Sequence, residues 1–252
     1  MDRKMLKRHF TRDSAPDWMC PTCCKGVLRI KKDSFFSDER SLSRDHDHPA
    51  WEPEYIEHVY TCLLYCTNDK CKEVVASTGV GSVDWGVQDD ADGVPEQVYE
   101  DYFQPKYFEP PLKILNLPTK CPETILAPIN ESFRLVFASP SSAANCIRVA
   151  VEELLTDLNI RRFKNVNGAR KYINLHQRIS LIPEKYSEIR DLIFAIKWLG
   201  NAGSHSDGTI SFDDVMDAYE FFEHIVLEVY DQKGKQLKAK AKKVNKKKGP
   251  EK

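Results

Sequence analysis

Hydrophobic and polar residues follow two different patterns along the chain. Two runs in the first third, residues 27–30 and 56–66, are rich in β-branched, aromatic and leucine side chains and are typical of strands. The polar stretch between them, residues 33–54, predicts a loop or an irregular hairpin. The first third is therefore expected to form a small β module.

From about residue 131 the apolar positions recur at steps of three and four, which predicts helices. Ser139 is a candidate N-cap with Pro140 at the first helical position, Pro183 ends the second helix, and Ser211 with Asp214 forms a capping-box variant. Four amphipathic helices with short connections predict an all-α bundle. Their apolar stripes are Ala143, Ile147, Ala150, Leu154 and Leu158; Tyr172, Leu175, Ile179 and Ile182; Ile189, Leu192, Ile193, Ile196 and Leu199; and Val215, Ala218, Phe222, Ile225 and Val229.

The segment between these regions, residues 87–130, contains seven prolines and five interspersed aromatic residues. So many prolines disfavour regular helix or sheet, whereas the aromatic residues argue against a free linker. We expect an extended arm that packs against one or both domains.

Two closely spaced cysteine pairs carry the clearest chemistry. Cys20 and Cys23 form a C-x2-C knuckle, and Cys66 and Cys71 form a second pair at the end of the later predicted strand. Two such pairs can supply four thiolates at about 2.3 Å from one tetrahedral Zn²⁺. Four thiolates leave no open position for water, so this zinc is expected to be structural, and a zinc hydrolase is disfavoured.

Other candidate ligands fit less well. Cys62 and Cys66 lie four residues apart on one predicted strand, roughly 13 Å along it, so Cys62 is interpreted as a core thiol. Cys24, which is adjacent to Cys23, is interpreted as a residue that does not bind the metal. His46 and His48 form an H-x-H pair in an acidic loop, a pattern more typical of solvated side chains than of a second metal site.

Charge is distributed unevenly along the chain. The net charge of −1 conceals ten lysines and one glutamate from Lys233 onward, which leaves the preceding residues strongly acidic. The lysine-rich tail is interpreted as disordered and solubilising, and RNA or DNA binding is the alternative.

The N-terminus lacks the apolar core of a secretory signal and no run of residues predicts a membrane span, so we expect a cytoplasmic protein. The expected segments are a basic N-terminal segment (1–14), a zinc-ribbon module (15–86), the proline-rich arm (87–130), the helical bundle (131–232) and the tail (233–252).

Polar residues interrupt the apolar stripes of the bundle in two places. Arg148 and Glu152 lie one turn apart, as in a routine surface ion pair. Lys197, Asn201 and His205 fall at four-residue steps and would share one helix face. The glycines among them could instead end the helix, or let another helix or a phosphate approach closely.

Taken in order, Ser139-Pro140, the segment 148–152, the run Gly200-Asn201-Ala202-Gly203-Ser204-His205 and the capped last helix resemble the bacterial domain-of-unknown-function family numbered 4145. The resemblance covers roughly residues 131–230. That family looks related to the HEPN superfamily of helical bundles, which recur, often as dimers, in toxin–antitoxin, restriction and anti-phage systems. The resemblance therefore implies an α+β chain with an N-terminal four-cysteine zinc ribbon, an HEPN-like bundle, a homodimer through that bundle, and a protein partner from a defence or toxin–antitoxin operon.

Active HEPN ribonucleases carry an Arg-Asn-x(3–6)-His motif and cut RNA without a metal. Asn201 and His205 match its Asn and His, whereas Gly200 stands where the motif has Arg. Lys197 or Arg148 could supply the missing cation, although lysine offers no bidentate fork. Two hypotheses follow: a metal-independent endoribonuclease that uses His205, Asn201, Arg148, Glu152 and Lys197, or a binding module in which these residues form a structural network. Gly200 favours the binding module.

Overall fold

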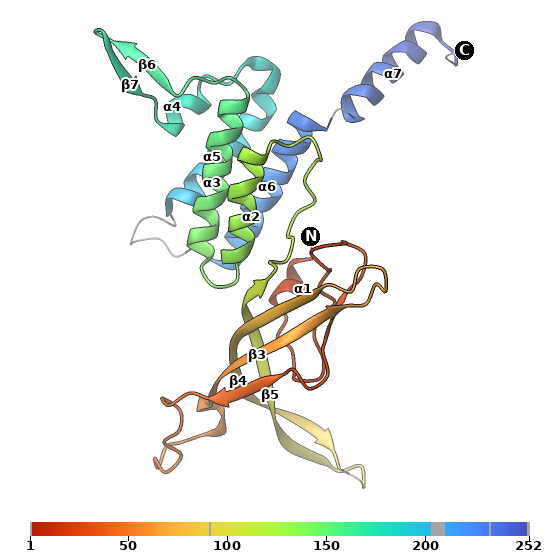
Figure 1. The fold of residues 1–252 in the computed structure, drawn as a ribbon, viewed down its shortest axis with the longest axis vertical. Helices are drawn as coiled ribbons and strands as arrows, with labels where there is room; N and C mark the ends of the chain where they lie inside the picture. Colours follow the sequence, from red (N-terminus) through yellow and green to blue (C-terminus); the bar gives the residue numbers. More distant parts are fainter. Residues whose placement is uncertain (1, 91, 203–209, 232, 251–252) are drawn as a thin grey trace. The chain divides into compact units, whose positions relative to one another are not determined.

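The computed structural model describes residues 2–90, 92–202, 210–231 and 233–250. The chain divides into two compact units, Met1–Lys113 and Ile114–Lys252. The first unit holds a curled antiparallel sheet and the second holds most of the helices (Figure 1). The predicted combination of a β module with a later helical region is thus confirmed at this level.

The sheet of the first unit is built around one central strand. The unit comprises α1 (Arg3–Lys7), β1 (Leu28–Ile30), β2 (Phe36–Glu39), the 3₁₀ turn η1 (Pro53–Tyr55), β3 (Glu57–Cys66), β4 (Val74–Asp89) and β5 (Pro95–Glu109). The strand order is β1-β3-β4-β5, and β2 also pairs with β3. Alternate residues of β3 are buried, including Tyr60, Cys62 and Leu64, so one face of the sheet covers the core.

Residues 95–109 form a long strand, so the prediction of an arm without regular structure over 87–130 is wrong there. Pro95 is the first residue of β5, and Pro105 lies opposite Gly79 where the register shifts at a bulge. Both are positions at which a sheet tolerates the missing N–H of proline. A Cβ on Gly79 would lie 2.2 Å from the carbonyl oxygen of Gln104, so the bulge depends on glycine there. The sheet therefore extends well beyond the predicted module boundary at residue 86.

The predicted basic N-terminal segment is part of the first unit. Phe10 exchanges two backbone hydrogen bonds with Phe103 of β5, with N–O distances of 3.0 and 2.7 Å. Its ring is buried and packs edge-to-face against Trp18 and Tyr60, with centroids 5.3 Å away in each case. Within residues 2–14, Phe10 therefore joins the aromatic core, so the predicted segment is not separate from the sheet module.

The second unit is a cluster of helices with one small hairpin. Its elements are α2 (Glu123–Leu135), α3 (Pro140–Asp157), β6 (Phe163–Val166), β7 (Ala169–Tyr172), α4 (Leu175–Ile179), the 3₁₀ segment η2 (Glu184–Ile189), α5 (Arg190–Ala202), α6 (Phe212–Tyr230) and α7 (Lys233–Lys247). Helix α3 packs against α2, α5 and α6. Apolar side chains such as Ile129, Ile147, Ile193 and Phe222 fill the core between these helices.

Three expectations for this region need correction. Residues 169–172 belong to a β-hairpin, so the unit is not all-α and the predicted second helix shrinks to α4. Helix α2 begins at Glu123, inside the predicted arm. The tail, expected to be disordered, forms α7, whose many lysines and two alanines are good helix formers.

The ends of two helices follow the predicted signals. Pro140 occupies the first turn of α3 after Ser139 as N-cap. At α6 the Ser211 and Asp214 capping box is complete, because each side chain accepts a hydrogen bond from the backbone of the other residue. Among the described residues, none of the helices combines the length and the apolar character needed to cross a bilayer.

Candidate functional site

The four predicted cysteines converge at one end of the sheet. The sulfur of Cys20 lies 3.9 Å from that of Cys71, and the sulfur of Cys23 lies 3.7 Å from that of Cys66. All four sulfurs lie within 4.8 Å of one another, and all four cysteines are free thiols. Ligands at about 2.3 Å from a tetrahedral ion would lie about 3.8 Å apart. The cluster therefore has the donors and the spacing to hold a metal ion.

Backbone and side-chain amides point at these sulfurs. Gly26 N lies 3.5 Å from Cys23 Sγ, Asn68 N lies 3.4 Å from Cys66 Sγ, and Asn68 Nδ2 lies 3.6 Å from Cys23 Sγ. The contact from Gly26 contributes most to lowering the pKa of Cys23 to about 6. Burial raises the pKa of Cys66 to about 12 despite the opposing contact from Asn68 N. A Cβ on Gly26 would lie 2.6 Å from Cys66 Sγ, so only glycine lets the two knuckles approach this closely.

A hydrogen bond ties the two knuckles together outside the sulfur cluster. The hydroxyl of Thr22 in the first knuckle donates to the carboxylate of Glu73, just after the second. This bond lowers the pKa of Glu73. The Thr22–Glu73 hydrogen bond and the amide contacts to sulfur together hold the four cysteines in positions suited to binding a metal ion.

The other cysteines of the first unit lie outside the cluster. Cys62 is 2% exposed in the sheet core, and burial raises the pKa of its thiol to about 12. Cys24 Sγ lies near the carbonyl oxygen of Pro21 and does not join the four sulfurs. The interpretation of both as non-ligands agrees with this arrangement.

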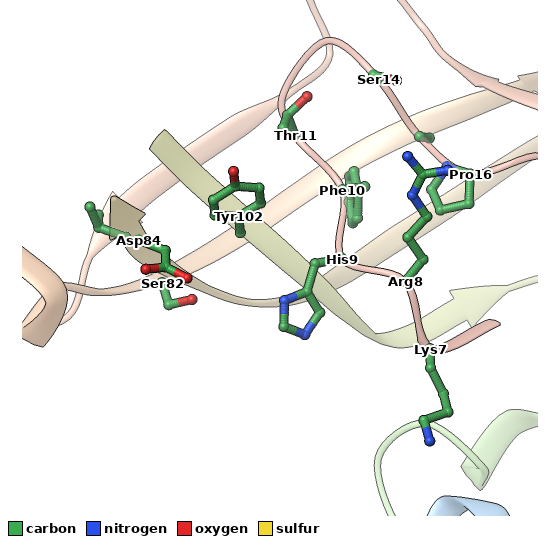
Figure 2. Close-up of a pocket in the computed structure, with 12 residues that line it drawn as sticks. Lys7, Arg8, His9, Phe10, Thr11, Ser14, Pro16, Ser82, Asp84 and Tyr102 are labelled. Carbon is green, nitrogen blue, oxygen red and sulfur yellow. The ribbon is translucent and has the colours of Figure 1, made fainter. Parts of the chain in front are cut away.

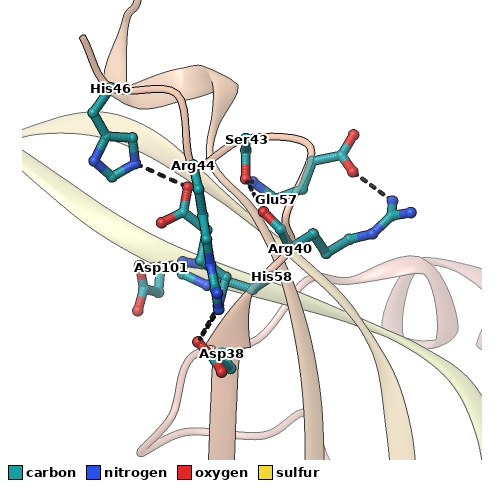
Figure 3. Close-up of polar contacts among 9 residues, drawn as sticks. Asp38, Arg40, Ser43, Arg44, His46, Glu57, His58 and Asp101 are labelled. Atoms are coloured by element: carbon teal, nitrogen blue, oxygen red, sulfur yellow. Dashed lines mark hydrogen bonds and ion pairs between the residues drawn. The ribbon is translucent and has the colours of Figure 1, made fainter.

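His46 and His48 do not converge on a common point. His46 Nε2 lies 3.0 Å from Glu39 Oε1, whereas His48 Nδ1 accepts a hydrogen bond from the backbone N–H of Ala50 at 3.2 Å. Figure 3 places His46 among exposed ion pairs such as Arg44–Asp38 at 3.0 Å. Among the residues that the structure describes, the only group of three or more potential ligands is the cysteine cluster.

In the helical unit, Arg148 and Glu152 form an ion pair on α3 that is more buried than a surface pair. Their side chains are only 25% and 16% exposed. Arg148 also donates from Nε and Nη2 to Asn145 Oδ1, at 3.2 and 3.0 Å. The other oxygen of Glu152 accepts a hydrogen bond from the hydroxyl of Tyr172, at 3.3 Å. Arg148 and Glu152 thus belong to a polar cluster, hereafter the Arg148 cluster, that also includes Asn145 and Tyr172.

The other predicted site residues are arranged differently. Gly200 lies against the stem of Arg148, so α5 brings the start of the predicted motif to the Arg148 cluster. Asn201 follows it in the last turn of α5 and is partly buried. Lys197 is 8% exposed, and its ammonium lies 3.3 Å from the ring centroid of Trp198. His205 falls outside the described residues.

Arg178 of α4 is a fully buried arginine, and its structural role was not predicted from the sequence. Its guanidinium donates to the carbonyl oxygens of Glu152 and Ile160, at 3.0 and 3.1 Å, and to Thr156 Oγ1 at 2.9 Å. It thereby fastens α4 to the end of α3 and to the start of the β6–β7 hairpin. Asn145 was the more predictable partner, because it lies three residues before Arg148 on a predicted helix.

An open cavity of about 580 Å³ lies between the N-terminal segment and strands β4 and β5 (Figure 2). Arg8, His9 and Lys7 contribute cationic or titratable groups, whereas Asp84 contributes a carboxylate and Tyr102 a phenol. The mixed charges select no single class of ligand.

Comparison with known proteins gives two family matches. Residues 8–108 match the family model described as "Domain of unknown function (DUF8608)", which covers most of the sheet unit. Residues 130–247 match the model described as "Domain of unknown function (DUF4145)", which covers most of the helical unit. No curated protein and no solved structure matches the chain. The segment 130–247 is therefore a domain of the DUF4145 family, as its motifs predicted.

Proposed function

We propose that this protein is a binding component of a prokaryotic conflict system, such as toxin–antitoxin, restriction or anti-phage defence. In this proposal a zinc-stapled sheet and an HEPN-like helical unit present surfaces to a protein or nucleic-acid partner. The DUF4145 domain and its resemblance to HEPN bundles support the cellular context.

The cysteine cluster supports a structural role for the first unit. Its four thiols match the donor set of a closed four-thiolate zinc site, and their spacing fits a tetrahedral ion. Zn²⁺ bound there by Cys20, Cys23, Cys66 and Cys71 would fix the two knuckles relative to each other. A closed thiolate shell offers no coordination position to a substrate.

The main support for the binding proposal is that Arg148 already hydrogen-bonds to neighbouring side chains. Three of its N–H groups are directed at Asn145 and Glu152, and its stem packs against Gly200. To stabilise the charge on a scissile phosphate, the guanidinium would have to leave these partners. Lys197 is 8% exposed, and its ammonium lies over the ring of Trp198. Neither cation is thus presented in the manner of a catalytic arginine.

The endoribonuclease that uses Asn201 and His205 is the alternative to be tested. Purified full-length protein and its His205→Ala variant should be incubated with labelled tRNA and single-stranded RNA, with and without EDTA. The binding proposal predicts intact RNA in every case and a lower melting temperature for the variant. Cleavage by the wild type that is lost in an equally stable variant would overturn the proposal.

The conflict-system context needs a separate measurement. Deleting the gene in its host should change the plating efficiency of phages or the stability of plasmids, and a copy carrying intact cysteines should restore it. Unchanged phage and plasmid phenotypes across a panel would remove this part of the proposal.

A further inference from the structure

The β6–β7 hairpin is the one sheet of the helical unit among the described residues, and its two strands pair only with each other. Asn167 and Gly168 form the turn with φ values of 51° and 77°, which is the backbone of a tight two-residue hairpin. In Figure 1 the hairpin extends outward from the helices. An isolated two-stranded hairpin is only marginally stable in water. The β6–β7 hairpin must therefore be stabilised by contacts with the helices or by a bound partner.

The hairpin and its approach are strongly cationic. Five basic residues lie within eleven positions, and no acidic residue occurs between Asp157 and Glu184. Lys164 and Lys171 lie directly opposite each other on the two strands. Opposed like charges destabilise a strand pair, and a bound polyanion would reverse that cost. The five basic residues are Arg161, Arg162, Lys164, Arg170 and Lys171.

Two aromatic rings lie on the same face of the hairpin as Arg170, whereas Lys164 and Lys171 lie on the opposite face. Phe163 and Tyr172 are cross-strand partners, with ring centroids 5.8 Å apart and planes at 75°. The residues are 39% and 51% exposed. The guanidinium carbon of Arg170 lies 3.8 Å from the centroid of Phe163. Exposed rings with a cation beside them form a platform on which unpaired bases can stack while an adjacent phosphate is neutralised.

The base of the hairpin is anchored to the helices. Ile160 and Ile173, which flank the two strands, are buried. Arg178 holds the carbonyl oxygen of Ile160, and the hydroxyl of Tyr172 donates to Glu152 of the Arg148 cluster. Arg162 forms an ion pair with Glu153 of α3, with Nη1 3.4 Å from Oε1. These contacts fix the orientation of the exposed rings, so little order has to be gained on binding.

We propose that the β6–β7 hairpin is a docking surface for single-stranded RNA. The rings of Phe163 and Tyr172 stack on unpaired bases, and Arg170 on the same face neutralises an adjacent phosphate. Lys164 and Lys171 on the opposite face attract the phosphates that pass along the edges of this two-stranded hairpin. Asn165 shares a face with Phe163 and Arg170, and its exposed amide offers the donor and acceptor that a ribose 2′-hydroxyl can use. This inference rests on the proposed binding function and names the class of partner at this surface.

The test is a fluorescence-anisotropy titration of full-length protein with a labelled single-stranded RNA of about twelve nucleotides. The hairpin pair Arg170→Gln/Lys171→Gln, which includes the cation on the face of the rings, is compared with the tail pair Lys246→Gln/Lys247→Gln, which removes the same net charge. The hairpin pair should weaken binding at least about tenfold and lower the slope of log K against log salt by about 1.4. The tail pair should change affinity less than about twofold. Equal losses for the two pairs would overturn the assignment to the hairpin.

Three further arms separate stacking and sugar recognition from general polyanion binding. Phe163→Leu should weaken RNA binding at least about fivefold at unchanged salt slope, because it removes a ring without a charge. Single-stranded DNA of the same sequence, duplex RNA and polyglutamate at equal charge should each bind more weakly. Equal binding of any of these three, or no effect of Phe163→Leu, would overturn the proposal. Unchanged circular dichroism and melting temperature must accompany each variant.

The integrity of the RNA after each titration distinguishes the two proposals. Intact RNA with hairpin-dependent binding supports both. RNA cut in a His205-dependent manner would overturn the proposed binding function, while the hairpin variants would still report where the RNA docks. Intact RNA that does not bind would overturn the hairpin inference alone.

Discussion

Gly200 of α5 lies directly against Arg148 of α3: a Cβ atom on Gly200 would be 2.7 Å from the Cβ of Arg148. It would also be 3.1 Å from the carbonyl oxygen of Ala144. Gly200, the position at which the resemblance to HEPN ribonucleases would call for an arginine, is therefore a packing residue. It sets the distance between two central helices beside the Arg148 cluster.

We predict that Gly200→Ala destabilises the protein by about 1–3 kcal/mol, because the added methyl group forces α3 and α5 apart. At an exposed helical position the same substitution would stabilise by about 1 kcal/mol, so the sign of the change is informative. Urea unfolding followed by the helical circular-dichroism signal measures it. Gly200→Arg, which places an arginine directly before Asn201, should be more destabilising still. A stability equal to or above that of the wild type would show that the helices do not need this contact.

Arg178 gives a second prediction. Arg178→Ala should lower the free energy of unfolding by about 3 kcal/mol, because it leaves the buried carbonyl oxygens of Glu152 and Ile160 without donors. The matched control is Arg161→Ala, which removes an exposed arginine from the same part of the chain and should cost less than about 0.5 kcal/mol. Arg178→Lys keeps the charge but not the planar fork, so it should fall between the two. Similar values for Arg178→Ala and Arg161→Ala would contradict the bracing role.

The features that local sequence specifies were predictable. The C-x2-C knuckle, the strand before the second cysteine pair and the capping box of α6 each depend on residues within a few positions of one another. Even the exclusion of Cys62 required only the rise of a strand. Convergence of the two cysteine pairs is the one longer-range prediction, and it followed because a tetrahedral site accepts few alternatives.

The features that depend on distant partners were not predictable from pattern. Pro105 is compatible with a strand only because it meets a bulge at Gly79, twenty-six positions earlier in the sequence. Residues 163–172 carry too little apolar periodicity to reveal a hairpin, and Asn167-Gly168, a recognised turn signal, is the only local indication of one. The polar role of Arg178 appears only once α3 and α4 are placed side by side.

The cysteine cluster gives a third prediction. Cys66→Ser should reduce bound zinc from about one ion per chain to near zero and unfold the sheet unit, because structural zinc sites contribute much of the folding free energy of small modules. Cys62→Ser is the matched control on the same strand, and it should retain zinc with only a modest loss of stability. Inductively coupled plasma mass spectrometry of reduced, zinc-replete protein measures the content. Full zinc occupancy in Cys66→Ser, or loss of zinc in Cys62→Ser, would refute the assignment of ligands.

The capping box of α6 gives a prediction about pH. Asp214 accepts hydrogen bonds from the backbone N–H and the hydroxyl of Ser211, at 2.8 and 2.6 Å, and these bonds hold the pKa of its carboxyl below the ordinary value. A carboxyl whose pKa is lower in the folded state stabilises the protein at pH values above its unfolded pKa of about 3.9, and this contribution disappears as the pH falls through the folded value.

Asp214→Ala should therefore lower the free energy of unfolding by about 0.5 kcal/mol near neutral pH, a small value because the group is partly exposed and solvent screens its interactions. The difference between wild type and variant should shrink steadily as the pH is lowered below about 4. Ser211→Ala removes the other half of the box, and the double variant should cost less than the sum of the two single variants because they share one interaction. Urea titrations at a series of pH values provide the measurement. A wild-type advantage that persists undiminished at the lowest pH would mean that the ionised carboxylate is not what stabilises the start of α6.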